Sequence, residues 1–352
     1  MKSIQATSYF VHFEHKGYQE LNALIASKSY SSIFILVDEN THEHCYAKFI
    51  PKLAATCPIE LIEIMSGELH KNLETCVGIW NVLTELHADR KSLLITLGGG
   101  VITDLGGFVA ATFKRGIDFV NIPTTLLSMV DASVGGKTGV DLGVLKNQIG
   151  LFANPEMVLI DPDYLSTVTA REIRSGMAEI IKYGLTFDAN VYQTIKDHQN
   201  VNIIDLIHRS IAIKNEIVLQ DPRENNVRKI LNFGHTIGHA IESYHLESED
   251  KENLTHGEAI AIGMIAECYI SSKLLSFPYH EVSFLKNLIR TLYGKVSLSK
   301  DDFDIILTYL IHDKKNVGGQ VNFVLLEELG VTKLDCKVSN QLIEESIAYY
   351  NA

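Results

Sequence analysis

Two histidines spaced four residues apart are the residues of this chain that most readily suggest chemistry. His235 and His239 stand in the run LNFGHTIGHAIE, so on a helix their side chains share one face. Gly234 and Gly238 beside them leave room for another group to come close. His256 opens a later apolar stretch, and two or three imidazoles with a carboxylate make an open zinc site. Spacing alone assigns neither the third imidazole nor the acid, and helix histidines with backbone or water partners remain the alternative.

A glycine-rich turn is suited to holding a phosphate. The run LGGGVITD at 97–104 follows an apolar stretch and opens an apolar helix. Glycines let the backbone approach a pyrophosphate, and the free N–H groups at the helix start bind its charge. Thr103 stands where the dinucleotide fingerprint has its third glycine, so a tight turn without a ligand is the alternative. An earlier stretch ends in VDEN at 37–40, where an acidic residue could accept ribose hydroxyls, although that segment alone favours a surface turn.

Basic and amide side chains next to glycines are suited to binding anions. The run GGKT at 135–138 is not a Walker nucleotide site, because Asp131 occupies the position of its first glycine. These side chains nevertheless suit a phosphate and a carboxylate, while each of them alone is more often a solvated surface charge. They are Lys137, Lys146, Asn147, Arg228, Lys314, Lys315 and Asn316.

The elements that must position these groups change character about halfway along the chain. Between residues 31 and 161, short β-branched runs alternate with helical stretches, which is typical of a mostly parallel sheet with helices. After residue 161 the apolar spacing becomes helical, beginning with a capping box, TARE, at 169–172. Further helices are predicted at 202–219, 230–243, 258–275 and 280–293. We therefore predict an N-terminal α/β domain over 1–165 and an all-α C-terminal domain over 166–352.

The bulk composition is that of a globular protein. A chain of 352 residues is too long for one ordinary core, and its hydrophobic fraction of 46% is near the average. The formal net charge of −12 argues against nucleic acid or an anionic membrane as a partner. The five cysteines show no CxxC spacing, which argues against a disulfide framework and a cysteine-built zinc site. With neither a membrane-spanning apolar run nor a secretory signal, a cytoplasmic protein is expected.

Several segments together resemble the 3-dehydroquinate synthase family, in the family's order, from about residue 38 to residue 316. They are GGGVITDLGGF, RGIDFVNIPTTLLSMVDASVGGKTGV, SGMAEIIKYG, RKILNFGHTIGHAIE, HGEAIAIGM and DKKN. The resemblance implies a Rossmann-like N-terminal domain and a helical C-terminal domain. It also implies bound NAD, a divalent metal (usually zinc, with cobalt as an alternative) and a homodimer with the active site in the interdomain cleft.

The resemblance assigns residues as well. It makes Glu179, His235 and His256 the metal ligands, and it leaves His239 to contact the substrate or support a ligand. The residues implied to contact NAD are Asp38, Asn40, Glu68, Lys71, Gly99, Gly100, Val101, Asp104, Thr124, Thr125, Lys137, Lys146 and Thr167. Those implied to contact the substrate are Asp131, Lys137, Lys146, Asn147, Lys182, Arg228, Asn232, His239, one of Lys314 and Lys315, and Arg115 of a neighbouring subunit. The implied catalytic set is Glu172, Lys182, Arg228, Asn232 and His239.

The implied reaction converts 3-deoxy-D-arabino-heptulosonate 7-phosphate, a small phosphorylated sugar acid, to 3-dehydroquinate and phosphate. Transient oxidation by NAD acidifies a C–H bond, phosphate leaves by β-elimination, the hydride returns, and an intramolecular aldol closes the carbocycle. This is a lyase step of the shikimate pathway. The alternatives are a related sugar phosphate cyclase with another product, a polyol dehydrogenase of similar fold, and an inactive NAD-binding protein.

Two positions depart from the family pattern. Many members have glycine where Thr103 stands, so its side chain could crowd the pyrophosphate turn. Many also carry Asn-His-Pro-x-Gly-Lys-Asn where this chain has DLGVLKN at 141–147. Lys146 and Asn147 are kept, but the preceding loop is expected to differ in shape.

Overall fold

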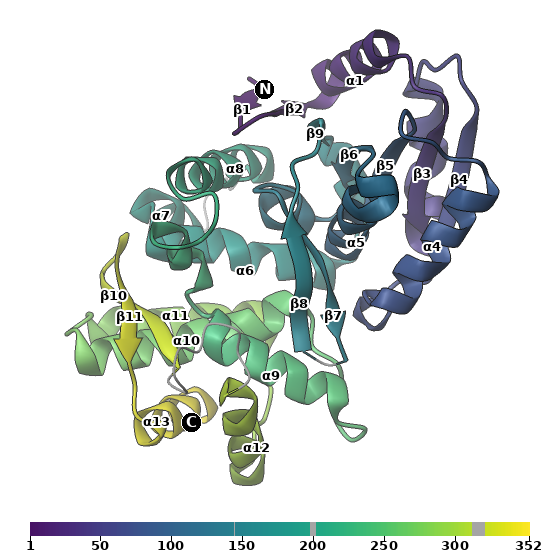
Figure 1. Cartoon of the computed structure of the whole chain (residues 1–352). Helices are drawn as coiled ribbons and strands as arrows, with labels where there is room; N and C mark the ends of the chain where they lie inside the picture. The colour runs from purple at the N-terminus through teal and green to yellow at the C-terminus, as the bar shows by residue number, and fades with distance from the viewer. Residues whose placement is uncertain (144, 198–201, 312–320) are drawn as a thin grey trace. The chain divides into compact units, whose positions relative to one another are not determined.

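The computed structural model describes residues 1–143, 145–197, 202–311 and 321–352 (Figure 1). These residues form two compact units. The first comprises Met1–Thr169 and Ile207–Leu219, and the second comprises Ala170–Leu206 and Gln220–Ala352. Helix α8 (Ile203–Gln220) therefore belongs mostly to the first unit, although it follows two helices of the second in sequence.

The first unit is built on a seven-stranded sheet in the order β1-β2-β9-β6-β5-β3-β4. All neighbouring strands are parallel except β1 and β2. The strands are β1 (Ile4–Gln5), β2 (Phe10–Phe13), β3 (Ile33–Asp38), β4 (Ile59–Ile64), β5 (Leu93–Gly98), β6 (Asp118–Pro123) and β9 (Met157–Ile160). The predicted α/β domain with a mostly parallel sheet is confirmed.

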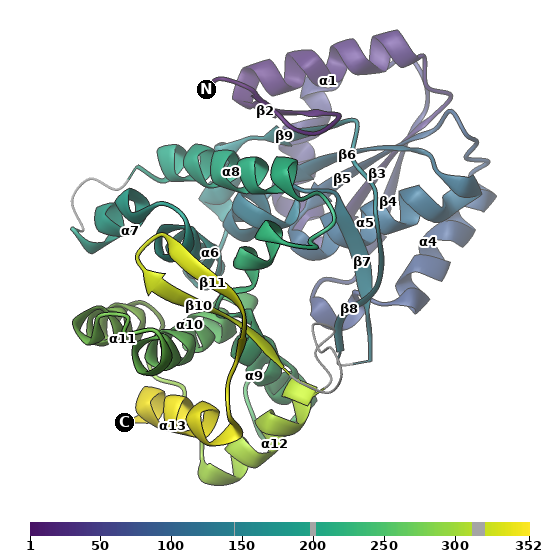
Figure 2. The same cartoon turned by 60° about the vertical axis from the view of Figure 1, so that its left-hand side comes forward.

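Helices cover both faces of this sheet, which is why β3 and β5 are mostly apolar and buried along almost their whole length. Helix α1 (Glu14–Lys28) lies above the strands in Figure 2, and α4 (Leu73–Glu85) and α5 (Gly100–Thr112) lie below them. Helix α5 approaches β5 closely because Gly106 has no side chain, since a Cβ there would lie 2.4 Å from Thr96 Cγ2. An antiparallel hairpin of β7 (Lys137–Leu142) and β8 (Leu145–Phe152) packs against this helix.

The second unit is mainly helical, as predicted. Its long helices are α6 (Ala170–Thr186), α7 (Ala189–Lys196), α9 (His235–Glu247), α10 (His256–Leu274), α11 (Tyr279–Tyr293), α12 (Lys300–Ile311) and α13 (Asn340–Asn351). Helix α10 is its central element, because it is buried along most of its length and packs against α6, α9, α11 and α13. A hairpin of β10 (Asn322–Glu328) and β11 (Val331–Lys337) is an addition that the helical pattern did not predict.

One predicted helix begins later than expected. The pattern predicted a continuous helix over 230–243, but a 3-10 turn, η7 (Val227–Asn232), precedes α9. Gly234 separates the two with φ +78°, a left-handed backbone that an α-helix does not contain. Within the described ranges, no helix is long and apolar enough to cross a membrane.

Candidate functional site

Three histidines and a glutamate of the second unit come together. His235 and His239 lie on α9, His256 begins α10, and Glu179 lies on α6. The Nε2 atoms of His235 and His256 lie 3.4 and 3.5 Å from Glu179 Oε1. Each of the three imidazoles also offers a ring nitrogen within 4.8 Å of the other two. The fold thus gathers the third imidazole and the acid that spacing could not assign.

The ring orientations suit ligands. His235 Nδ1 lies 3.0 Å from the carbonyl oxygen of Phe233, which can only accept, so Nδ1 donates and Nε2 keeps its lone pair towards Glu179. His256 Nδ1 lies 3.2 Å from Glu242 Oε2. Histidines that bind metals commonly donate their other ring N–H to a carbonyl or carboxylate in this way. Glu242 is therefore a supporting residue that the sequence did not indicate.

The Glu179 carboxylate tests whether a cation fits here. Its side chain is fully buried, and neither of its oxygens has a hydrogen-bond partner among the described residues. Its close neighbours are the ammonium group of Lys182, in an ion pair, and the two imidazoles. A buried carboxylate without hydrogen bonds is costly unless a cation compensates it. The donor set of one carboxylate and imidazoles fits a divalent metal of the zinc type.

The electrostatics of the cluster also favour positive charge. Burial lowers the pKa of His256, but Glu242 and Glu179 outweigh it and raise that pKa to about 10. Burial raises the pKa of Glu172, on the first turn of α6, above its ordinary value. Lys182, which is 1% exposed, is the cation that the fold itself places against Glu179.

A buried acid fixes the start of α9. Glu267, on α10, accepts hydrogen bonds from the backbone N–H of Gly234 at 2.6 Å and of Ile237 at 3.3 Å. A carboxylate at a helix N-terminus satisfies N–H groups that have no partner within the helix. The close contact of α9 with α10 depends on Gly263, where a Cβ would lie 1.9 Å from the carbonyl oxygen of Gly234. Together these contacts hold His235 and His239 at a fixed place beside α10.

The segment before α9 holds two further predicted residues. Arg228 is 1% exposed and donates from Nη1 to the carbonyl oxygen of Pro222 at 2.8 Å. Asn232 Nδ2 donates to Glu224 Oε1 at 2.8 Å. Asp221 accepts three backbone N–H groups from residues 225, 226 and 228; burial opposes them, yet they lower the pKa of this carboxyl. Asp221 and Glu224 thus hold the segment before α9 in place around the buried guanidinium of Arg228.

The glycine turn of the first unit joins β5 to α5, as predicted. Gly99 is the N-cap of α5 and Gly100 its first residue, so backbone N–H groups of the first turn are available to an anion. Thr124 follows β6 and donates its N–H to the carbonyl oxygen of Gly98 at 3.0 Å, which places Thr124 and Thr125 beside the turn. Thr103 is buried and donates to the carbonyl oxygen of Gly100 at 3.1 Å. Its side chain is therefore packed inwards and does not occupy the open side of the turn.

Two lysines and their acids form a network next to this turn. Lys71 Nζ donates to Asp104 Oδ2 at 2.7 Å and to Asn147 Oδ1 at 2.8 Å. Lys146 Nζ forms an ion pair with Glu68. Burial lowers the pKa of Lys71, but the carboxylates of Asp104 and Glu68 outweigh it and raise that pKa. The structure therefore brings together five residues that the resemblance assigned to NAD or substrate.

The other predicted residues of the first unit are more separate. Asp38 caps the short helix α2 (Glu39–Thr41) by accepting the N–H of Thr41 at 2.7 Å, and Asn40 is exposed in that helix. Lys137 is exposed at the start of β7. Thr167 ends the 3-10 turn η6 (Pro162–Thr167). Lys314 and Lys315 of the second unit lie outside the described residues.

One lysine of the first unit escaped the sequence analysis. Lys214 on α8 is 5% exposed, lies 3.0 Å from Asp131 Oδ1 and donates to the carbonyl oxygen of Asp131 at 2.6 Å. Asp131 was predicted to contact the substrate. Lys214 has no glycine or motif beside it and lies 83 residues after Asp131 in the sequence, so only the fold could identify this contact.

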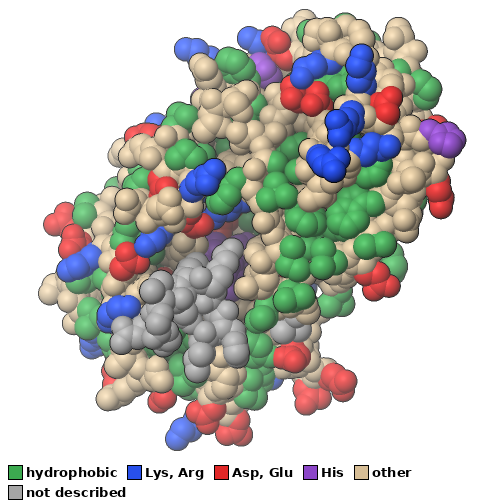
Figure 3. Space-filling view, in the orientation of Figure 1, with side chains coloured by type: hydrophobic (Ala, Val, Ile, Leu, Met, Phe, Trp, Pro, Cys, Tyr) green, Lys and Arg blue, Asp and Glu red, His purple; other side chains and the backbone are tan. Residues whose placement is uncertain are grey.

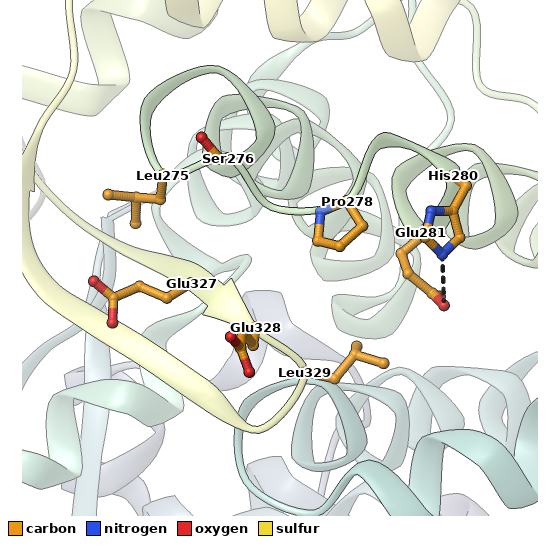
Figure 4. A pocket seen from close by; sticks show the side chains of 8 residues that line it. All are labelled: Leu275, Ser276, Pro278, His280, Glu281, Glu327, Glu328 and Leu329. Atoms are coloured by element: carbon orange, nitrogen blue, oxygen red, sulfur yellow. Dashed lines mark ion pairs between the residues drawn. The ribbon is translucent and has the colours of Figure 1, made fainter.

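A surface cavity of about 530 Å³ in the second unit lies apart from these groups (Figure 4). It is lined by Leu275, Ser276, Pro278, His280, Glu281, Glu327, Glu328 and Leu329. None of these residues was predicted to take part in the reaction.

Family models and individual relatives point to the same protein family. The models described as 3-dehydroquinate synthase N-terminal and 3-dehydroquinate synthase C-terminal match residues 61–175 and 176–316. The 3-dehydroquinate synthase of Parabacteroides distasonis is 41% identical over 336 residues, covering 94% of each chain.

Two solved structures share the fold over nearly the whole chain. A 2-deoxy-scyllo-inosose synthase complexed with carbaglucose-6-phosphate, NAD+ and Co2+ is 27% identical, with a TM-score of 0.85 and 99% of both chains covered. The 2-epi-5-epi-valiolone synthase of Streptomyces hygroscopicus, with NAD+ and Zn2+ bound, is 25% identical, with a TM-score of 0.84 and 99% and 98% covered. The predicted fold class, a Rossmann-like domain with a helical domain, is thereby confirmed. This chain belongs to the 3-dehydroquinate synthase family.

Proposed function

We propose that this chain converts 3-deoxy-D-arabino-heptulosonate 7-phosphate to 3-dehydroquinate and phosphate, as a carbon–oxygen lyase of the shikimate pathway. The observation that carries the proposal is the convergence of His235 Nε2 and His256 Nε2 on the buried Glu179 carboxylate. It occurs in a chain that is 41% identical to a 3-dehydroquinate synthase along almost its whole length. We also keep the division into an NAD-binding domain over 1–165 and a metal- and substrate-binding domain over 166–352 as part of the proposal.

A divalent metal, zinc or cobalt, would be held by Glu179, His235 and His256. The fit rests on the carboxylate oxygens of Glu179, which have no hydrogen-bond partner in the described part of the chain, and on the two Nε2 atoms that face them. Such an ion acts as a Lewis acid on a substrate oxygen. His239 lies in the same cluster, with its ring centroid 5.1 Å from that of His235, and we assign it to the substrate.

NAD would be held by the glycine turn at 98–100 and by the neighbouring Asp104, Thr124 and Thr125. The fit rests on the free N–H groups at the start of α5 and on the packed Thr103 side chain, which leaves the turn open. This cofactor supplies hydride transfer in both directions, so that no net NADH is formed.

The chain's own residues bind anions and move protons. The guanidinium of Arg228 and the ammonium of Lys182 are buried, where their charges act strongly on a phosphate or carboxylate. In the first unit Lys71, Lys137 and Lys146 offer further cations. We assign to a ring nitrogen of His239 the task of holding or releasing a proton near the reacting oxygen.

A homodimer completes the proposal. Figure 3 shows hydrophobic side chains gathered on the first unit, below a group of Lys and Arg side chains. The exposed apolar residues of this unit include Leu73, Val77 and Phe152, and such patches are typical of protein interfaces. Arg115 is exposed at φ +71°, a strained conformation that suits a residue reaching a partner's site.

We also propose a cytoplasmic location. The five free cysteines support a reducing, cytoplasmic location.

Release of phosphate tests the function. Purified protein with NAD and zinc should release phosphate from the heptulosonate phosphate, and a chelator should stop the reaction until metal is added back. A hexose 6-phosphate serves as the control substrate and should release none, which separates this activity from that of a related cyclase. No phosphate from the heptulosonate phosphate under any metal condition would refute the proposal.

A further inference from the structure

The β7–β8 hairpin contains an irregularity at the residues predicted to bind ligands. Val140 pairs with Ile149, but Leu142 pairs with Leu145, so the register shifts between the two pairs. Asp141 alone therefore faces three residues of β8, at positions 146–148. Such bulges re-aim side chains and are common next to functional sites. Here the bulge presents Lys146 and Asn147.

Asp141 connects the two strands of this bulge with a segment before α4. The side chain is 5% exposed, and Oδ1 accepts the backbone N–H of Asn147 at 2.6 Å. Its own N–H donates to the carbonyl oxygen of Lys71 at 2.9 Å. Its Oδ2 lies 3.6 Å from Lys146 Nζ. Through its carboxylate and its backbone N–H, Asp141 thus contacts three residues that the proposed function uses.

The hydrogen bond to Asn147 holds an unfavourable backbone conformation. Asn147 has φ +51°, a left-handed conformation that costs energy for residues other than glycine, although asparagine tolerates it better than most. In that conformation Asn147 Oδ1 accepts from Lys71 Nζ, which in turn donates to Asp104 on the first turns of α5. Gly143, at φ +58° in the connection between the strands, adds little stiffness of its own.

We propose that Asp141 is a positioning residue: its carboxylate locks Asn147 in the left-handed conformation and thereby sets Lys71 and Lys146 for anion binding. This rests on the proposed function, because it assumes that these lysines grip NAD and substrate. The backbone hydrogen bond, at 2.6 Å, carries the effect, and the ionic contact at 3.6 Å adds little. A substitute for Asp141 that still accepts a hydrogen bond from the Asn147 N–H should therefore preserve anion binding. A substitute that cannot accept this bond should weaken it.

Three variants test this. Asp141→Ala removes the acceptor and should raise both the KM for the heptulosonate phosphate and the Kd for NAD about tenfold, the size of one lost hydrogen bond, with kcat within about threefold of wild type. Asp141→Asn keeps an acceptor oxygen without the charge and should restore both constants to within about threefold of wild type. Asp118→Asn is the matched control, because Asp118 also pairs with a lysine (Lys28, 3.1 Å) but begins β6, at the opposite end from the glycine turn.

Each outcome decides the inference. Wild-type KM and Kd in Asp141→Ala, or equal losses in the alanine and asparagine variants, would overturn it, since the second result would assign the effect to charge. If thermal melting shows that Asp141→Ala does not fold, Asp141→Ser, whose short hydroxyl falls short of Asn147, takes its place with the same expected tenfold loss. NAD binding is measured without turnover, so the series remains decisive even if the wild-type protein releases no phosphate.

Discussion

The lysine network of the first unit and the histidine cluster of the second differ in how their charges are compensated. In the first unit, Lys71 pairs with Asp104 and Lys146 with Glu68, so cations and acids already neutralise one another. In the second, the Glu179 carboxylate is fully buried without a hydrogen bond among the described residues, and its close neighbours are Lys182 and the imidazoles of His235 and His256. The first region is complete without a ligand, whereas the second is completed by a cation.

This difference predicts how each region responds to change. In the lysine network, a bound anion only replaces a carboxylate as the partner of a lysine. Single substitutions there should therefore alter the affinity for NAD or substrate by modest factors. In the histidine cluster, removing one proposed metal ligand should abolish metal binding and, with it, turnover. The following predictions are arranged from the largest expected effect to the smallest.

Removing a proposed ligand should have the largest effect. His235→Ala deletes one of the two Nε2 atoms that face Glu179, and we expect turnover to fall by more than about 100-fold with metal content lost. Elemental analysis and phosphate release measure both quantities. His280→Ala, at a histidine that is 79% exposed, is the control. A His235→Ala protein that keeps its metal and its rate would refute the ligand assignment.

Removing a supporting acid should have an intermediate effect. Glu242→Gln weakens the interaction that orients His256, and such changes lower metal affinity by about 10- to 100-fold. Competition with a chromogenic chelator gives the affinity directly. If affinity is unchanged, Glu242 does not orient the ring. Turnover at saturating metal should recover in large part, which distinguishes this variant from His235→Ala.

Metal removal should destabilise the protein through the second unit. A ligand at about 100 times its Kd stabilises the folded state by about 2.7 kcal/mol, so a chelator should lower the melting temperature by several degrees. Adding zinc back should restore it. Glu179→Gln should melt at the same temperature with and without chelator, and a response to chelator equal to that of wild type would contradict the assignment.

A charged cluster of the second unit that has no proposed role in the reaction should affect only stability. At Asp302, burial opposes ionisation, but Tyr244 and Lys251 outweigh it and lower the pKa to about 2. Because the folded pKa lies below the unfolded value of 3.8, this group stabilises the fold above about pH 4 and loses that contribution as the pH falls towards 2. Asp302→Asn should cost about 2 kcal/mol at pH 7, with unchanged turnover. Denaturant melts at pH 7 and pH 3 test this, since the difference between the two proteins should shrink at pH 3.

The sequence predicted some parts of the site well because their signals are local. The glycine turn and the His235–His239 spacing each lie within a few residues, so strand, turn and helix face could be inferred from the sequence pattern. The break at Gly234 was missed because a positive φ leaves no mark in an apolar pattern. The β7–β8 and β10–β11 hairpins were missed because their strands mix polar with apolar residues, which gives a weaker apolar pattern than that of the buried sheet strands.

Contacts between distant segments could not be inferred from residue types. Glu179 stands 56 residues before His235, and only the packing of α6 against α10 brings it to the histidines; the resemblance supplied it where spacing did not. Glu242 lies at the end of the LNFGHTIGHAIE run and Asp141 at the start of the 141–147 segment, but neither they nor Lys214 received a role from the sequence. Their roles depend on hydrogen bonds that exist only in the folded chain.

One measurement tests the central claim most directly: phosphate and NADH followed together while the zinc-loaded enzyme turns over the heptulosonate phosphate. The proposed reaction predicts steady phosphate release with no net NADH, and a complete stop when the metal is chelated. Accumulation of NADH in step with substrate loss would show a dehydrogenase instead. Phosphate release that continues unchanged without metal would contradict the role of Glu179, His235 and His256.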